Sequence, residues 1–233
     1  MPLPPALPRG RSGLTPPRPL GTPPKEGKTH IMKEAFDFLA AQEPIFKSIV
    51  NQYGLPTIPL RPPGFETLVL LILEQQVSID SAKATYLRLR EKVVTFEPEK
   101  LVALSEEDFR SAGVSRQKTN YIKGLSLSII NKEIFLDSLA EKTTVEVRDE
   151  LIKIKGIGHW TIDVYLMFAL QASDIIPVGD VALQKTINEL FGIYNKEEML
   201  LYAEKWSPYR SYATFLLWHH YLKKRNRKIS YNF

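Results

Sequence analysis

Two glycines separated by one residue, Gly156-Ile157-Gly158, mark the first place where the backbone itself could bind a ligand. Glycines at this spacing permit a tight turn between helices and leave backbone amides without partners. Amides at a helix start bind anions, because they are unpaired donors at the positive end of the dipole. No strand-like segment precedes the glycines, which argues against a dinucleotide-binding turn. The pattern therefore indicates either a helix-hairpin-helix that binds a nucleic-acid phosphate or a plain turn between packed helices.

Asp180 is the second candidate for chemistry. It follows a Pro-Val-Gly turn and directly precedes a helical apolar pattern formed by Val181, Leu183, Ile187 and Leu190. Aspartate is a preferred N-cap residue, and a helix N-terminus also stabilises a charged carboxylate. A capping role and a chemical role are therefore compatible. Asp163, on the apolar segment after the glycines, is a rival acid, for which pairing with a basic neighbour is the favoured interpretation.

Composition excludes several other chemistries. The sequence has no cysteine, which excludes disulfides, a thiol nucleophile and cysteine-ligated zinc or iron–sulfur clusters. Its four histidines have no spacing typical of metal ligands. No apolar run is long enough to span a membrane, and the lack of cysteine fits a reducing interior, so we expect an intracellular protein.

The net charge of +5 is weak evidence for nucleic-acid binding. Residues 1–28 hold five of the 31 basic residues but one of the 26 acidic ones, which leaves 26 basic against 25 acidic residues elsewhere. Any basic face must therefore come from the placement of charges.

The elements that must position these residues are predicted to be helical throughout. We expect a disordered Pro-rich extension over residues 1–28 and an all-α domain over residues 29–233, with about ten helices and a middle lobe at about residues 65–190. Capping boxes are predicted at Ser105 with Asp108 and at Thr143 with Glu146. The segment from His159 to Leu170 is predicted to be amphipathic, and Ser207-Pro208 is predicted to begin the last helix.

Three blocks of sequence, in order, resemble one known family. They are LILEQQVS at residues 71–78, LIKIKGIGHWTIDVYLMFAL at residues 151–170 followed by PVGDVALQKTI, and WSPYRSYATFLLW at residues 206–218. Together they resemble the helix-hairpin-helix DNA glycosylase superfamily (HhH-GPD), and within it the alkylation-repair branch, 3-methyladenine DNA glycosylase II. The resemblance covers residues 33–226 and implies two helical lobes flanking a DNA-binding cleft.

The resemblance also assigns roles. It implies that Asp180 is the catalytic carboxylate, that Trp160 and Tyr209 line the base pocket, and that Gln76, with its neighbour Gln75, is the wedge that replaces an extruded base. Trp218 is interpreted as a core residue. Phosphate contacts would come from Gly156, Gly158, His159 and Thr161, and carbonyls of Ile154 and Ile157 would hold a monovalent cation, K⁺ or Na⁺. Lys118 is either a phosphate contact or a solvated residue.

The implied activity is that of a monofunctional DNA N-glycosylase. It would excise alkylated purines such as 3-methyladenine and 7-methylguanine by base flipping, as a monomer without a required cofactor, in a bacterial cytoplasm or a nucleus. Trp160 stands where bifunctional relatives carry a nucleophilic lysine, so no lyase activity is expected. The alternatives are a non-catalytic module that binds distorted or abasic DNA and a uracil- or mismatch-directed glycosylase of the same fold.

Overall fold

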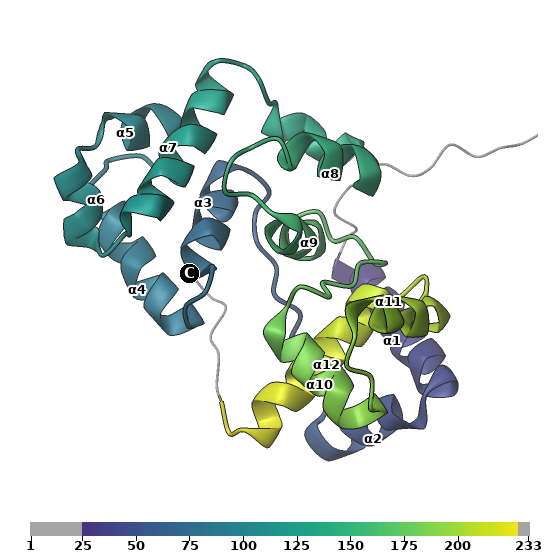
Figure 1. The fold of residues 1–233 in the computed structure, drawn as a ribbon. Helices are drawn as coiled ribbons and strands as arrows, with labels where there is room; N and C mark the ends of the chain where they lie inside the picture. The colour runs from purple at the N-terminus through teal and green to yellow at the C-terminus, as the bar shows by residue number, and fades with distance from the viewer. Residues whose placement is uncertain (1–24, 228–233) are drawn as a thin grey trace, which may run out of the picture.

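The computed structural model describes residues 25–227 of the chain, and this part is helical without a strand, which confirms the all-α prediction (Figure 1). The α-helices are α1 (Lys25–Gln42), α2 (Pro44–Tyr53), α3 (Phe65–Glu74), α4 (Ile79–Arg90), α5 (Pro98–Ala103), α6 (Glu106–Ala112), α7 (Arg116–Ile130), α8 (Thr144–Leu151), α9 (His159–Phe168), α10 (Val181–Phe191), α11 (Lys196–Tyr202) and α12 (Arg210–Lys224). Two short 3₁₀ helices span Leu136–Glu141 and Ala203–Trp206.

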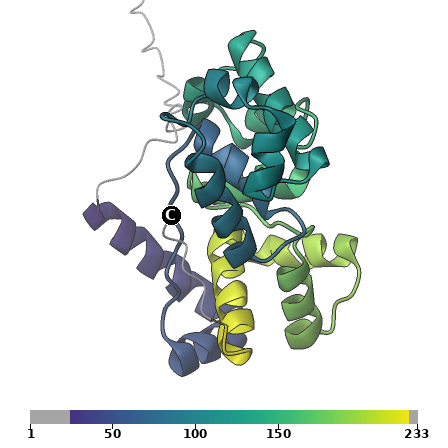
Figure 2. The same cartoon turned by 90° about the vertical axis from the view of Figure 1, so that its left-hand side faces the viewer.

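The helices form two lobes, each with its own apolar core. Helices α3 to α9 enclose the first core, and α1, α2 and α10 to α12 enclose the second. The start and end of the described chain therefore meet, with α1 and α2 beside α12 (Figure 2). Ile175 packs in the first core and Ile176 packs in the second, so the chain passes from one lobe to the other at this point. Helix α10 therefore belongs to the second lobe and not, as predicted, to a middle lobe that reaches residue 190.

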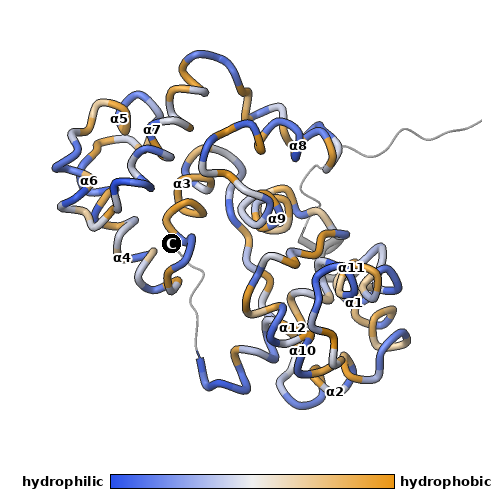
Figure 3. The backbone as a smooth tube through the Cα atoms, in the orientation of Figure 1, coloured by the Kyte–Doolittle hydropathy of each residue, from blue (hydrophilic) through white to orange (hydrophobic). Residues whose placement is uncertain are grey.

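Helices α3 and α9 lie at the centre of the first lobe and form its most apolar part (Figure 3). Every residue from Thr67 to Glu74 and from Thr161 to Phe168 is buried. The amphipathic prediction for residues 159–170 was therefore wrong, because neighbouring helices cover α9 on all sides instead of leaving one polar face.

The predicted helix starts are largely confirmed. Both capping boxes are present, with Ser105 and Thr143 each exchanging hydrogen bonds with an acidic residue three positions later. The prediction for the last helix was wrong, because α12 begins at Arg210 and the Ser207 hydroxyl bonds to Asp174 instead. At the other end, α1 already includes Lys25–Lys28, and the rest of the predicted disordered extension lies outside the described residues.

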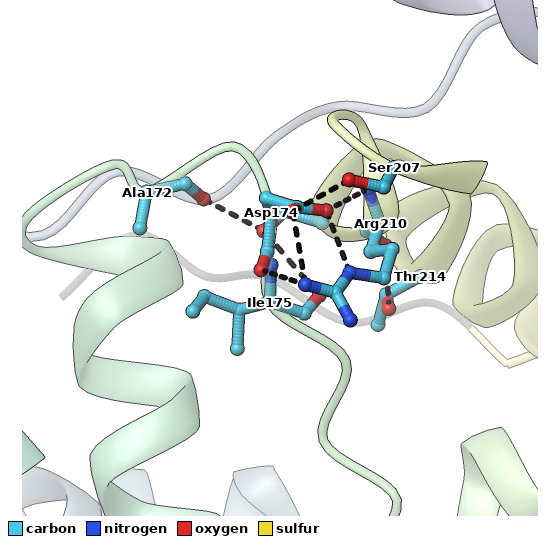
Figure 4. Close-up of polar contacts among 7 residues, drawn as sticks. Ala172, Asp174, Ile175, Ser207, Arg210 and Thr214 are labelled. Carbon is cyan, nitrogen blue, oxygen red and sulfur yellow. Dashed lines mark hydrogen bonds and ion pairs between the residues drawn. The ribbon is translucent and has the colours of Figure 1, made fainter. Parts of the chain in front are cut away.

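The loop after α9 is fastened to the start of α12 (Figure 4). The Asp174 carboxylate accepts hydrogen bonds from Arg210 Nε at 2.6 Å, Arg210 Nη2 at 2.9 Å and Ser207 Oγ at 2.9 Å. The Ser211 hydroxyl donates to the Ala172 carbonyl at 2.6 Å. Since this loop continues into the turn before α10, these bonds help fix the position of Asp180.

Candidate active site and DNA-binding hairpin

The two glycines form the turn of a helical hairpin between α8 and α9. Gly156 adopts φ +95°, and a Cβ built there would lie 2.1 Å from Cγ of Tyr121, so both conformation and space require glycine. Gly158 is the N-cap of α9 and provides no capping side chain. Gly158 and His159 are both exposed. This geometry is suited to anion binding by the first amides of α9.

Gln75 braces this hairpin from the neighbouring helix. Its Nε2 donates to the Gly156 carbonyl at 2.8 Å and lies 3.0 Å from the Thr161 hydroxyl. Thr161 is buried, so its side chain is committed to the brace and only its backbone amide would be suited to phosphate binding. Gln76 differs from its neighbour, because it is exposed and adopts φ +59°, a left-handed conformation uncommon outside glycine.

Lys118 holds the turn after α3 that contains Gln75 and Gln76, which we call the glutamine turn. Its Nζ donates to the carbonyls of Leu73 at 2.7 Å and Gln75 at 2.8 Å, at the C-terminal end of α3. Burial lowers the pKa of this ammonium group below its ordinary value. Lys118 therefore caps the α3 end and supports the glutamine turn, a role that neither sequence interpretation had assigned to it.

Asp180 caps α10, as predicted, and also binds two tryptophans. Its Oδ1 accepts hydrogen bonds from the Leu183 amide at 2.8 Å and from Trp218 Nε1 at 2.9 Å. Its Oδ2 accepts from Trp160 Nε1 at 3.0 Å. The carboxylate is thus held in one orientation by donors from α9, α10 and α12.

Two cavities adjoin Asp180. The larger, about 1150 Å³, lies between the glutamine turn and the hairpin and contains Gln76, Gly158 and Trp160 in its lining. The smaller, about 630 Å³, shares Trp160 and Asp180 with it. Its wall is mainly apolar and aromatic, formed in part by Val164, Phe168, Trp218 and Tyr221. A fixed carboxylate beside a concave aromatic wall is suited to binding a flat, electron-poor ring.

The structure brings Asp180 and Trp160 together but places Tyr209 elsewhere. Tyr209 is the N-cap of α12, its hydroxyl donates to Glu34 at 2.9 Å, and its ring packs on Phe38. It lines neither cavity, so the structure does not support its expected place in a base pocket beside Asp180. Trp218, interpreted as a core residue, packs against both apolar cores and also lines the smaller cavity. No local signal in the sequence indicated its contact with Asp180, because Trp218 and Asp180 are 38 residues apart.

Asp163 has the structural role that the sequence favoured. Its carboxylate lies 2.5 Å from Nη2 of Arg148 and lines neither of these cavities. Burial raises its pKa above the ordinary value, and the Arg148 charge only partly opposes this effect. The Arg148–Asp163 contact joins α8 to α9, the two helices of the hairpin.

A buried ion pair that sequence analysis missed lines the smaller cavity. Arg61 Nη1 and Nη2 donate to the two carboxylate oxygens of Glu74 at 2.9 and 2.6 Å. Glu74 is the last residue of α3, immediately before the glutamine turn. The two partners are 13 residues apart, and no local pattern in the sequence indicates the contact.

Two kinds of feature are absent from the described residues. Within residues 25–227 no group of three or more histidine, cysteine, aspartate or glutamate side chains is arranged to hold a metal. None of the helices in this part of the chain is long and apolar enough to cross a membrane.

Comparison with known proteins places these features in a family. The family described as "HhH-GPD superfamily base excision DNA repair protein" matches residues 69–210. A crystal structure of a DNA-3-methyladenine glycosidase from Bacillus halodurans is 31% identical, with a TM-score of 0.70, and the match covers 82% of this chain and 91% of that one.

Two curated relatives carry similar names. A DNA-3-methyladenine glycosylase of Bacillus subtilis is 29% identical over 77% of this chain and 64% of its own length. A second Bacillus subtilis protein of similar name, YfjP, is 34% identical over 52% of this chain and 43% of its own length. The chain thus spans less than two thirds of each of these two relatives.

Proposed function

Because the chain belongs to the HhH-GPD superfamily of base excision DNA repair proteins, we propose that it is a monofunctional DNA N-glycosylase that excises alkylated purines. Its relatives are named as 3-methyladenine glycosylases. The observation that carries the proposal is Asp180, fixed by two indole N–H groups at the edge of an aromatic cavity.

Asp180 would act on the sugar. As the N-glycosidic bond breaks, its electron pair leaves with the base and positive charge develops on the deoxyribose. A preorganised carboxylate stabilises that charge. Water then adds to the anomeric carbon, and its proton passes to Asp180 or to solvent. An N3- or N7-alkylated purine is cationic and leaves as a neutral base, so it needs no dedicated acid.

The aromatic cavity would receive the extruded base. Trp160, Trp218 and Phe168 provide electron-rich faces, which attract a cationic ring. The volume of about 630 Å³ is within the range of small-molecule sites. Stacking and the lability of the alkylated base would together select the substrate.

The hairpin and the glutamine turn would bind the DNA. The amides of Gly158, His159 and Thr161 would bind a backbone phosphate, and Gly156 would permit the turn that presents them. Exposed Gln76 would fill the space left by the extruded base, while Gln75 holds the hairpin. Carbonyls of Ile154 and Ile157, of a donor type suited to hard cations, would hold K⁺ or Na⁺ beside the phosphate.

The proposal also includes the partner, the assembly state and the location. The partner is double-stranded DNA with alkylated or abasic sites, bound by a monomer without a required cofactor. Its location would be intracellular, in a bacterial cytoplasm or a nucleus. Trp160 has no amine to form a Schiff base, so strand cleavage is not part of the reaction.

The test is release of free bases from methylated duplex DNA. We expect release of 3-methyladenine and 7-methylguanine, with strand breaks that appear only after alkali treatment of the product. Binding to abasic duplex without base release would support a non-catalytic module and overturn the proposal. Breaks that form without alkali would overturn the monofunctional assignment.

A further inference from the structure

We infer that Glu74, held by Arg61, accepts a hydrogen bond from the exocyclic amino group of the extruded base, and thereby selects amino-bearing purines over hypoxanthine. This inference rests on the proposed function and adds a polar contact to an aromatic pocket. Glu74 would determine which base is accepted, whereas Asp180 would act on the sugar.

The Arg61–Glu74 pair is rigidly placed. Arg61 and Glu74 are 6% and 8% exposed, and both guanidinium Nη atoms bond to the carboxylate. The Arg61 amide donates to the Phe168 carbonyl at 3.0 Å, and its guanidinium carbon lies 5.2 Å from the centroid of the Phe168 ring. Main-chain and side-chain contacts together therefore fix the carboxylate.

Glu74 borders both cavities. Glu74 lines the larger cavity, which contains the glutamine turn, and the smaller one, which contains the aromatic wall. Trp160 and Asp180 also line both. A base that moves from the DNA side into the aromatic wall would thus remain within reach of Glu74, on the same route that passes Asp180.

Stability alone is a poor reason for this pair. Replacing a buried ion pair by well-packed apolar residues is often neutral or stabilising. The apolar alternative is available here, because the six residues before Glu74 on α3 are apolar and buried. A buried charged pair that lines a mainly apolar cavity is better explained by recognition of a polar ligand.

The chemistry of a carboxylate identifies that ligand. A carboxylate offers about four acceptor sites, and the two bonds from Arg61 use one on each oxygen. The remaining sites accept N–H donors and disfavour carbonyl oxygens. The amino group of an alkylated adenine or guanine is such a donor, and the positive charge on the alkylated ring strengthens the bond. Hypoxanthine carries a carbonyl oxygen in place of the adenine amino group.

The test compares single-turnover excision of 3-methyladenine with that of hypoxanthine in duplex DNA. For Glu74→Gln we expect 3-methyladenine excision to fall by roughly 10–100-fold, the equivalent of one charged hydrogen bond, with little change for hypoxanthine. Glu66→Gln is the matched control, because Glu66 lies on the same helix, pairs with Arg90 and lines neither cavity. It should leave both rates unchanged.

A double variant separates recognition from folding. Arg61→Met with Glu74→Leu removes both charges and should fold, and we expect it to lose the preference for 3-methyladenine while binding abasic duplex as the wild type does. A folded double variant with an unchanged ratio of the two rates overturns the inference alone. A wild-type protein that releases no alkylated base overturns the proposed function, and the inference with it.

Discussion

Trp218 Nε1 lies 2.9 Å from Oδ1 of Asp180, while Trp160 occupies the other oxygen of the same carboxylate. Trp160 comes from α9 in the first lobe, and Trp218 comes from α12, which closes the second. The orientation of Asp180 therefore depends on the packing of both lobes. Each indole has two functions here, as a hydrogen-bond donor and as part of the cavity wall.

The first prediction separates these two functions. Trp218→Phe keeps an aromatic ring but removes the N–H donor, so Oδ1 of Asp180 loses one of its two hydrogen bonds and keeps only the one from the Leu183 amide. We expect the single-turnover rate of base release to fall about 10-fold or more, since a hydrogen bond to a charged group contributes roughly 1.5–3 kcal/mol. Affinity for abasic duplex should stay near the wild-type value.

Trp206→Phe is the control for this variant. Trp206 is fully buried in the core of the second lobe and lines neither cavity, so its replacement should affect stability rather than the rate. Equal rates for Trp218→Phe and the wild type would contradict the idea that the indole N–H orients Asp180.

The second prediction distinguishes the two glutamines. Gln76→Ala removes an exposed side chain and should lower affinity for abasic duplex about 10-fold or more, with little change in unfolding temperature. Gln75→Ala removes the bonds to Gly156 and Thr161 and should lower the unfolding temperature as well. Thermal unfolding and titration of labelled duplex measure both effects. The reverse pattern would make Gln75 the wedge.

The third prediction concerns the hairpin turn. Gly156→Ala should destabilise the protein by more than about 1 kcal/mol, because φ is positive and Cβ would overlap the Tyr121 ring. Gly124→Ala, in α7 with no atom within 4 Å of the added Cβ, should instead stabilise it by roughly 0.5–1 kcal/mol. Denaturant unfolding of both variants tests the contrast, and equal effects would mean that the strain is relieved by local movement.

Much of this architecture could be predicted from local sequence. The capping boxes, the glycine turn and the Asp180 cap depend on residues within a few positions of one another, and such patterns are visible in a linear chain. Periodicity also gave the helical class, although it did not indicate the burial of α9 on every side.

The contacts that complete the site connect distant segments, and these could not be predicted. Trp218 and Asp180 are 38 residues apart, and Gln75 and Gly156 are 81 apart. The resemblance favoured Tyr209 for the pocket and left Trp218 in the core, but the packing of α12 brings Trp218 to the cavity. Arg61 and Glu74 are ordinary charged residues until the fold buries them together.

The fourth prediction concerns the hydrogen bonds that Asp174 accepts from Ser207 and Arg210 (Figure 4), which together form a clamp between the loop after α9 and the start of α12. Burial opposes the charged form of Asp174, but hydrogen bonds from Arg210 and Ser207 outweigh it and lower the pKa of the carboxyl group. The clamp is therefore fully stabilising above the unfolded-state pKa of about 3.9, and its contribution is lost as pH falls through the lower folded-state value.

Asp174→Asn provides the measurement of this effect. At pH 7 we expect it to lower the free energy of unfolding by about 1 kcal/mol, a modest value because the pair is partly exposed. The difference from the wild type should shrink below pH 4. A difference that is constant from pH 7 to pH 3 would show that the charge of Asp174 does not stabilise the fold.

The most direct test of the central claim is base release from methylated duplex DNA by Asp180→Asn. Asparagine also caps helices well, so the start of α10 and the unfolding temperature should be largely preserved. We predict a loss of at least about 10²–10³-fold in the single-turnover rate, with abasic-site binding retained. A folded Asp180→Asn protein that releases 3-methyladenine at the wild-type rate would contradict the account and leave Asp180 as a helix cap alone.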